Sequence, residues 1–260
     1  MGLRSAIAAV ATAIALLATS ACQPAAETGT PSGRAVVDSA IAAHGGAVLD
    51  HAVVTFTFRG VDFRLRQDAG RFRYQRTYTD SLDRTVREVL SNDSLSRTVD
   101  GSRVTLSDDE RGSVETAVNS VAYFALLPHP LGDPAVQTAY RGRDTLDGTT
   151  YHRVRVTFEQ DGGGRDWQDR FLYWFNTNTY AMDYLAYAYG FAPGEERGTR
   201  FREAYNVRRI EGVRVADYAN YTDPSLALDA LDRYPDRFND DALTLVSRVE
   251  LDSVQVRPLR

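Results

Sequence analysis

Three carboxylates in the last third of the chain are the side chains whose type best suits acid–base chemistry. Asp183, Glu203 and Asp217 each lie in a segment where polar and apolar residues alternate, as they do in β-strands. Two carboxylates that face each other across a cleft can act as general acid and general base, in the manner of a glycosidase. Arg202 and Arg208 are close in the sequence and can pair with these acids instead. This polar cluster predicts either an envelope hydrolase acting on a sugar or an ester, or a set of structural ion pairs, which we favour.

A run of three glycines, Gly162–Gly164, is a second candidate, because glycine-rich loops can cradle phosphate groups. Such a loop needs a helix directly after it, so that backbone N–H groups and the helix dipole converge on the anion. Residues 169–175 instead alternate like a strand. The glycines therefore predict a hairpin turn between a strand at 154–160 and a strand at 171–175, with positive φ angles that other residues resist.

Other catalytic signatures are missing from the sequence. All thirty cationic residues are arginine, which excludes Schiff-base chemistry and a P-loop lysine. There is no GxSxG nucleophile elbow and no zinc-ligand spacing. Thirty-five acidic residues give a net charge of −5, which argues against nucleic acid as a partner. We predict no catalytic residue, no metal and no cofactor; enzyme activity stays open, with a non-enzymatic role favoured.

Residues 1–21 have the features of an export signal: Arg4 precedes an apolar run, and small residues follow it. Cys22 comes next and is the only cysteine, so no internal disulfide can form. A cysteine after Thr19-Ser20-Ala21 is similar to a bacterial lipobox, which predicts a lipid anchor on Cys22 and a tether over residues 22–33. The expected location is the cell envelope, membrane-anchored and facing the periplasm, with the outer membrane favoured.

Residues 34–260 are expected to form a single, mainly β domain. Ser32 is a suitable N-cap for a first helix that ends at Gly45-Gly46. A second helix is predicted from a cap at Ser113 to Pro128. Elsewhere the alternation has a period of two and predicts about eleven antiparallel strands, in the order helix, four or five strands, helix, six or more strands. No βαβ pattern is present.

This element order, with the export signal and the lipid anchor, resembles the outer-membrane lipoprotein-sorting superfamily of the LolA and LolB type. That resemblance implies one strongly curved antiparallel sheet, an unclosed β-barrel, whose hollow is covered by helices. Short motifs also look like an uncharacterised family of bacterial lipoproteins over most of the mature chain. They are HGG at residues 44–46, YFALLP at 123–128, the glycine triplet at 162–164, DYLAY at 183–187, RFREAYNVR at 200–208 and DYANY at 217–221.

The segment 114–127 is apolar around most of its circumference, so it is expected to lie between the sheet and a hollow. Tyrosines on the late strands could wall an amphipathic pocket there. The predicted ligand-binding residues are Val118, Val121, Tyr123, Phe124, Tyr184, Tyr205 and Tyr218. We predict a monomer that binds a lipid or another hydrophobic small molecule, as in lipid or lipoprotein transport, and that reaches the membrane through its acylated cysteine. The alternatives are the hydrolase above and a non-catalytic structural envelope protein with no cavity.

Overall fold

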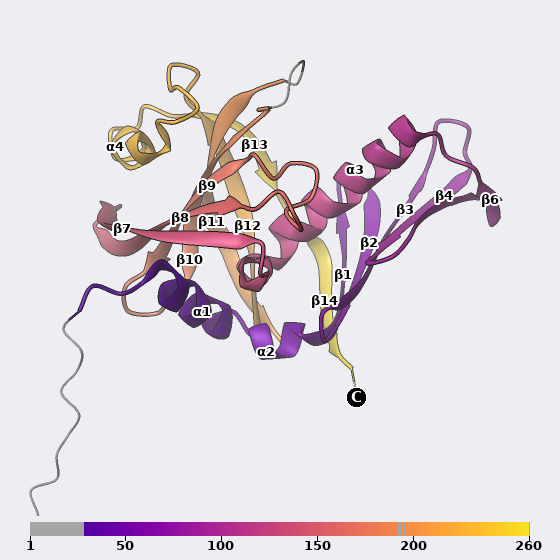
Figure 1. Cartoon of the computed structure of the whole chain (residues 1–260), viewed down its shortest axis with the longest axis horizontal. Helices are drawn as coiled ribbons and strands as arrows, with labels where there is room; N and C mark the ends of the chain where they lie inside the picture. The colour runs from indigo at the N-terminus through magenta and orange to yellow at the C-terminus, as the bar shows by residue number, and fades with distance from the viewer. Residues whose placement is uncertain (1–28, 192–193, 195, 260) are drawn as a thin grey trace, which may run out of the picture. The chain divides into compact units, whose positions relative to one another are not determined.

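Two antiparallel β-sheets form the framework of the computed structural model, which describes residues 29–191, 194 and 196–259 (Figure 1). Residues Pro31–Arg260 group into one unit by their contacts. The predicted export signal, Cys22 and residues 23–28 of the tether lie outside the described residues.

The first sheet has seven strands, and most of its apolar side chains face one way. In β2, buried Phe63 and Leu65 alternate with exposed Arg64 and Arg66, which is the pattern of a sheet with one face in a core and one in water. The strand order is β14 (Asp252–Pro258), β1 (His51–Phe58), β2 (Val61–Asp68), β3 (Arg71–Thr79), β4 (Thr85–Ser91), β5 (Leu95–Val99) and β6 (Ser102–Val104).

The second sheet also has seven strands, but it is covered on both faces. All five residues of Phe171–Phe175 in β9 are therefore buried. The strand order is β13 (Thr244–Val249), β12 (Val213–Thr222), β11 (Gly198–Ile210), β10 (Met182–Tyr189), β9 (Arg170–Asn176), β8 (Thr149–Phe158) and β7 (Val136–Leu146). The chain passes from the first sheet to the second between β6 and β7, and it returns between β13 and β14 through residues 250 and 251 only.

The predicted mainly β, unclosed antiparallel fold is confirmed, with two differences. The described residues contain fourteen strands instead of about eleven, and the strands form two sheets instead of one. The alternation from Leu243 to Val256 is nearly continuous, so it contains no signal for the change of sheet. A long-range contact lies at this change of sheet: the Leu251 N–H donates to the Asp217 carboxylate on β12 at 3.0 Å.

The first helix cap and two glycine turns lie where the sequence predicted them. The first helix, α1 (Gly33–Ala43), begins at the Ser32 cap, whose side chain accepts a hydrogen bond from the Ala35 N–H at 3.1 Å. Gly45 then takes a φ of 86° and separates it from the short α2 (Gly46–Leu49). The Gly162–Gly164 loop joins the paired strands β8 and β9, with no helix after it, so the predicted hairpin turn is confirmed.

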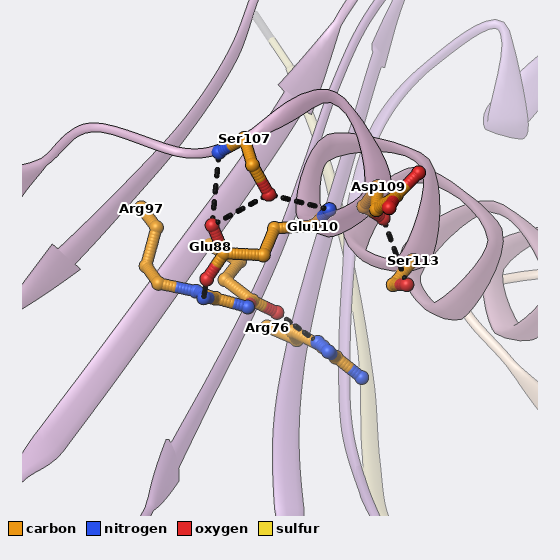
Figure 2. A network of polar contacts seen from close by, with 7 residues as sticks. All are labelled: Arg76, Glu88, Arg97, Ser107, Asp109, Glu110 and Ser113. Atoms are coloured by element: carbon orange, nitrogen blue, oxygen red, sulfur yellow. Dashed lines mark hydrogen bonds and ion pairs between the residues drawn. The ribbon is translucent and has the colours of Figure 1, made fainter.

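The long helix α3 (Asp108–Leu126) begins earlier than predicted. Its N-cap is Ser107, which forms a capping box with Glu110: the serine oxygen accepts from the Glu110 N–H, and the glutamate accepts from the Ser107 N–H (Figure 2). The predicted cap, Ser113, lies inside the helix and donates to the Asp109 carbonyl oxygen. The apolar stripe starts only at Val114, so periodicity alone placed the helix start too late.

An ion-pair network centred on one buried carboxylate connects the start of α3 with the first sheet (Figure 2). Glu88 on β4 is fully buried and accepts hydrogen bonds from Arg76 on β3 and Arg97 on β5. Arg97 also lies 3.5 Å from Glu110, the N3 residue of the capping box. Both arginines neutralise the same buried carboxylate, which connects strands β3, β4 and β5. The contact between Arg97 and Glu110 connects these strands with the helix.

The far end of α3 contacts both sheets. Val114, Val118, Ala122 and Leu126 form a stripe at helical spacing that packs into the core of the first sheet. Tyr123 and Phe124 pack instead against the inner face of the second sheet, together with α1. The outer face of the second sheet forms a separate core with residues of the 226–243 segment, which contains the 3₁₀ turn η2 (Leu231–Arg233) and α4 (Tyr234–Asn239). Helix α3 is therefore placed between the two sheets.

Candidate functional site

A cavity of about 360 Å³ lies between α3 and the inner face of the second sheet. One wall is the α3 segment that contains Ser120, Val121, Phe124 and Ala125. The other wall is formed by β11, β12, β13 and Leu251 at the crossing between the sheets. Phe58 at the end of β1 and Arg59 in the turn that follows complete the lining. The volume is in the range of small-molecule sites, which is roughly 300–1,000 Å³.

A row of polar side chains crosses the sheet wall of this cavity. Arg202 on β11 is the direct cross-strand partner of Asn220 on β12, which in turn is the partner of Ser247 on β13. Residues that are directly opposite in an antiparallel sheet point to the same face and lie side by side. All three line the cavity. We call them the polar row.

Arg202 is a buried cation without a carboxylate partner among the described residues. Its residue exposure is 8%, and its guanidinium carbon lies 3.9 Å from the centre of the Phe124 ring. Nη2 donates to the Tyr187 hydroxyl at 3.0 Å, whereas Nε is buried with no hydrogen-bond partner. Buried arginines are normally paired, because an unsatisfied buried donor costs about 1–3 kcal/mol.

Asn220 is the second incompletely satisfied side chain, also with 8% exposure. Its Nδ2 donates to the Ser247 hydroxyl oxygen at 3.1 Å, and its Oδ1 has no partner. In the part of the chain that the structure describes, Arg202 Nε and Asn220 Oδ1 are the only buried side-chain polar atoms left without a partner. Both residues line this one cavity.

The rest of the sheet wall is mostly apolar. Tyr218 lies two residues from Asn220 along β12, and Ala216 lies two residues further. Val249 on β13 pairs with Tyr218. Burial raises the pKa of Tyr218 to about 12, so its hydroxyl stays neutral at physiological pH. With Val121, Phe124 and Ala125 opposite, the cavity has an apolar body and one polar row.

The predicted ligand-binding residues divide between this cavity and other places. Val121, Phe124 and Tyr218 line it, as does Arg202 from the predicted polar cluster. Val118 packs into the core of the first sheet. Tyr123 shares a 2.7 Å hydrogen bond with Tyr173 outside the cavity lining.

Two of the predicted tyrosines do not belong to the cavity. Tyr184 lies in the core of the outer face, where its ring is 5.6 Å from Phe201 and 5.4 Å from Phe238. Tyr205 donates to Glu250 at 2.7 Å, away from the lining residues. Strand register determines which side of the sheet each tyrosine faces. The sequence pattern did not determine this register.

The three carboxylates considered for acid–base chemistry each have structural partners. Asp183 accepts from Arg214 at 2.6 Å and from the Tyr151 hydroxyl at 3.2 Å; burial raises the pKa of Asp183, and Arg214 opposes this shift. Glu203 accepts from the Tyr221 hydroxyl at 3.1 Å.

Asp217 has the most partners of the three. It accepts two hydrogen bonds from Arg208, at 2.9 and 3.0 Å, one from Asn206 at 2.6 Å and one from the Leu251 N–H. Within the described residues, these contacts are ion pairs and hydrogen bonds that stabilise the sheet. They favour the structural interpretation of the three carboxylates and argue against the hydrolase alternative.

Sequence reasoning missed Asn220, Ser247 and the residues at the crossing between the sheets. Asn220 shares a strand face with Tyr218, and this spacing of two was available in the DYANY motif. Ser247 and Leu251 gave no such signal, because the pairing of β13 with β12 is a tertiary contact.

No helix in the part of the chain that the structure describes is long and apolar enough to cross a membrane.

Residues 25–251 match the model of a family of unknown function, DUF6503. The chain belongs to this family. The prediction of an uncharacterised family is therefore confirmed. No curated protein matches the sequence.

Three solved structures show what this DUF6503 member is similar to. A LolA superfamily protein from Nitrosomonas europaea is 10% identical, with 89% of this chain and 96% of that one covered and a TM-score of 0.48. A DUF1329 family protein from Desulfovibrio piger is 9% identical, with coverage of 87% and 93% and a TM-score of 0.46. The lipoprotein LppX from Mycobacterium tuberculosis is 15% identical, with coverage of 61% and 90% and a TM-score of 0.27.

Proposed function

We propose that this DUF6503 protein binds a lipid or another hydrophobic small molecule in the cavity between α3 and the second sheet. The observation that carries the proposal is the cavity itself: about 360 Å³, with a mostly apolar lining and the two unsatisfied buried polar atoms of the described chain. A structural protein with a fully packed core would have neither feature, since protein interiors are close-packed and their buried polar groups are paired.

The expected affinity follows from the apolar surface that a ligand would bury. Each buried methylene contributes about 0.8 kcal/mol, so about ten methylenes give roughly 8 kcal/mol before the cost of association. A gross energy of that size corresponds to micromolar binding at best. Binding of this strength is more suitable for a carrier or a sensor, which exchanges its ligand, than for a protein that retains its ligand permanently.

The same proposal includes the location. Cys22 after an export signal supports a lipid-anchored envelope protein that faces the periplasm at the outer membrane, and the tether up to Ser32 leaves the folded unit close to the bilayer. A binding site near a membrane would have access to lipids or lipoprotein acyl chains. We infer a role in lipid or lipoprotein transport, with the protein acting as a monomer.

Binding of N-phenylnaphthylamine, an uncharged fluorophore, tests the cavity directly. The wild-type protein is expected to bind it at micromolar concentration. Val121→Asp places a charged carboxylate in the lining and is expected to weaken binding at least about tenfold, since an apolar fluorophore would have to remove water from that charge.

The matched control is Thr116→Asp, which adds the same charge at an exposed position of the same helix and is expected to bind like the wild type. Urea unfolding of each variant shows whether its fold is intact. Absence of fluorophore binding by the wild type, or equal binding by a folded Val121→Asp variant, would overturn the proposed site.

A further inference from the structure

We propose that the natural ligand is an amphiphile with an anionic oxyacid head group, and that Arg202 binds this head group. The inference rests on the proposed function, because it names the chemical class of molecule that the same cavity accepts. It adds a polar specificity determinant to a site that an apolar ligand alone would not need.

The charges around the cavity favour an anion. The described residues that line it include two arginines, Arg202 and Arg59, and no acidic side chain, although the whole chain carries a net charge of −5. Arg59 is exposed at the turn between β1 and β2, whereas Arg202 is buried. A buried guanidinium is stabilised most by a carboxylate or a phosphate, to which it forms charge-assisted hydrogen bonds.

The contacts that Arg202 already makes are compatible with binding of an anionic head group. The Phe124 ring lies under the guanidinium and attracts the cation through its π face, and Tyr187 takes one hydrogen bond from Nη2. Aromatic stacking occupies the face of a guanidinium and leaves its edge, with its N–H groups, available for an oxyanion. The unpartnered Nε belongs to that edge.

The neighbours of Arg202 extend the polar end of the cavity. The Ser247 hydroxyl can donate to an oxyanion in addition to accepting from Asn220. The unpaired Oδ1 of Asn220 can accept from a protonated head group or a hydroxyl on the ligand. The polar row thus offers donors and an acceptor within one cross-strand line.

The cavity separates this polar end from an apolar end. Side chains two residues apart on a strand are separated by about 7 Å. Tyr218 and Val249 therefore lie about 7 Å from the polar row, and Ala216 lies about 14 Å from it along the same strand. A head group at Arg202 would direct its chain along Tyr218 and Ala216, beneath Val121 and Ala125 of α3.

Competition against bound N-phenylnaphthylamine tests the head group with three ligands of equal chain length: dodecanoate, dodecyl phosphate and dodecanol. The wild-type protein is expected to bind at least one anion about tenfold to a hundredfold more tightly than the alcohol, as is typical of a charge-assisted hydrogen bond. The better of the two anions identifies the head group as a carboxylate or a phosphate.

Arg202→Met removes the charge and keeps most of the apolar stem, so it is expected to abolish the preference for anions while fluorophore binding remains. The control, Arg248→Met, removes the same charge from an exposed position next to Ser247 on β13 and is expected to keep the preference.

The outcomes separate the two proposals. If the wild-type protein binds the fluorophore and binds dodecanol as tightly as both anions, the head-group inference is overturned while the cavity function stands. If it binds none of these molecules, both fail. Because the wild-type comparison needs no variant, the inference remains testable even where Arg202→Met does not fold.

Discussion

Replacing Asp217 with alanine should destabilise the protein more than any other change among the three carboxylates considered for catalysis. Asp217 is 3% exposed and accepts four hydrogen bonds, two of them from Arg208. Arg208 also donates to the Leu251 carbonyl oxygen at 2.8 Å, so this pair holds the crossing between the sheets from both sides. Loss of Asp217 would leave the Arg208 cation and the Leu251 N–H without this partner.

The expected cost follows from these contacts. Removing one member of a buried ion pair costs about 3–5 kcal/mol. The Arg208 side chain is 26% exposed, so water can partly solvate it and the lower end, about 3 kcal/mol, is the better value. For a domain of this size that corresponds to a fall in Tm of about 6–12 °C. Since Val249 and Leu251 line the cavity, fluorophore binding should weaken as well.

Urea unfolding followed by circular dichroism measures the effect against a control on the neighbouring strand. Glu203→Ala removes one hydrogen bond, from Tyr221, and should cost only about 0.5–1.5 kcal/mol. The double variant Asp217→Ala with Arg208→Met should recover part of the loss, because the uncompensated cation is then removed. A loss for Asp217→Ala no larger than that for Glu203→Ala would refute the structural role of this pair.

Three further changes have defined outcomes. Burial lowers the pKa of His44 from 6.5 to about 4, so the folded protein keeps it neutral; stability from this group is full above pH 6.5 and is lost as the pH falls towards 4. Between pH 7 and pH 5 the wild type should lose about 2 kcal/mol more unfolding free energy than His44→Gln, and equal losses would contradict the shift. Gly163→Ala should lower Tm more than Gly164→Ala, because a Cβ at 163 would collide with the Glu159 carbonyl oxygen, whereas position 164 is open and has only an unfavourable φ of 75°; the reverse order in thermal melts would show that this loop adopts another conformation. Cys22→Ser should move the protein from the membrane to the soluble envelope fraction, and unchanged retention with an unacylated wild-type N-terminus would refute the anchor.

Local patterns in the sequence determined the class of the fold. The period-two alternation predicted antiparallel strands, and the helix cap at Ser32 and the turn at Gly162–Gly164 were found where local chemistry placed them. These features depend on side chains within a few residues of each other, so a single stretch contains the whole signal. The capping box of α3 was also local, in the Ser107 and Glu110 pair, and was missed because the apolar stripe starts later.

The composition likewise excluded one kind of chemistry, since a chain without lysine has no side-chain amine that could form a Schiff base, whatever its fold. It could not show where the charged groups come together. Arg202 and Arg208 are six residues apart on one strand, but a bulge between Tyr205 and Arg208 separates their environments. One arginine pairs with Asp217 at the crossing between the sheets, and the other lines the cavity without a carboxylate partner in the described residues.

Only the tertiary structure decided which side chains meet in the cavity. Phe58, Phe124, Arg202, Asn220 and Ser247 come from four strands and a helix or their connections, over almost two hundred residues of sequence. Strand register sets the face on which each one lies, and a shift by one residue would exchange Tyr218 and Asn220 for Asp217 and Ala219. Register depends on the burial of all three cores at once, which is a property of the folded chain as a whole and of no single segment.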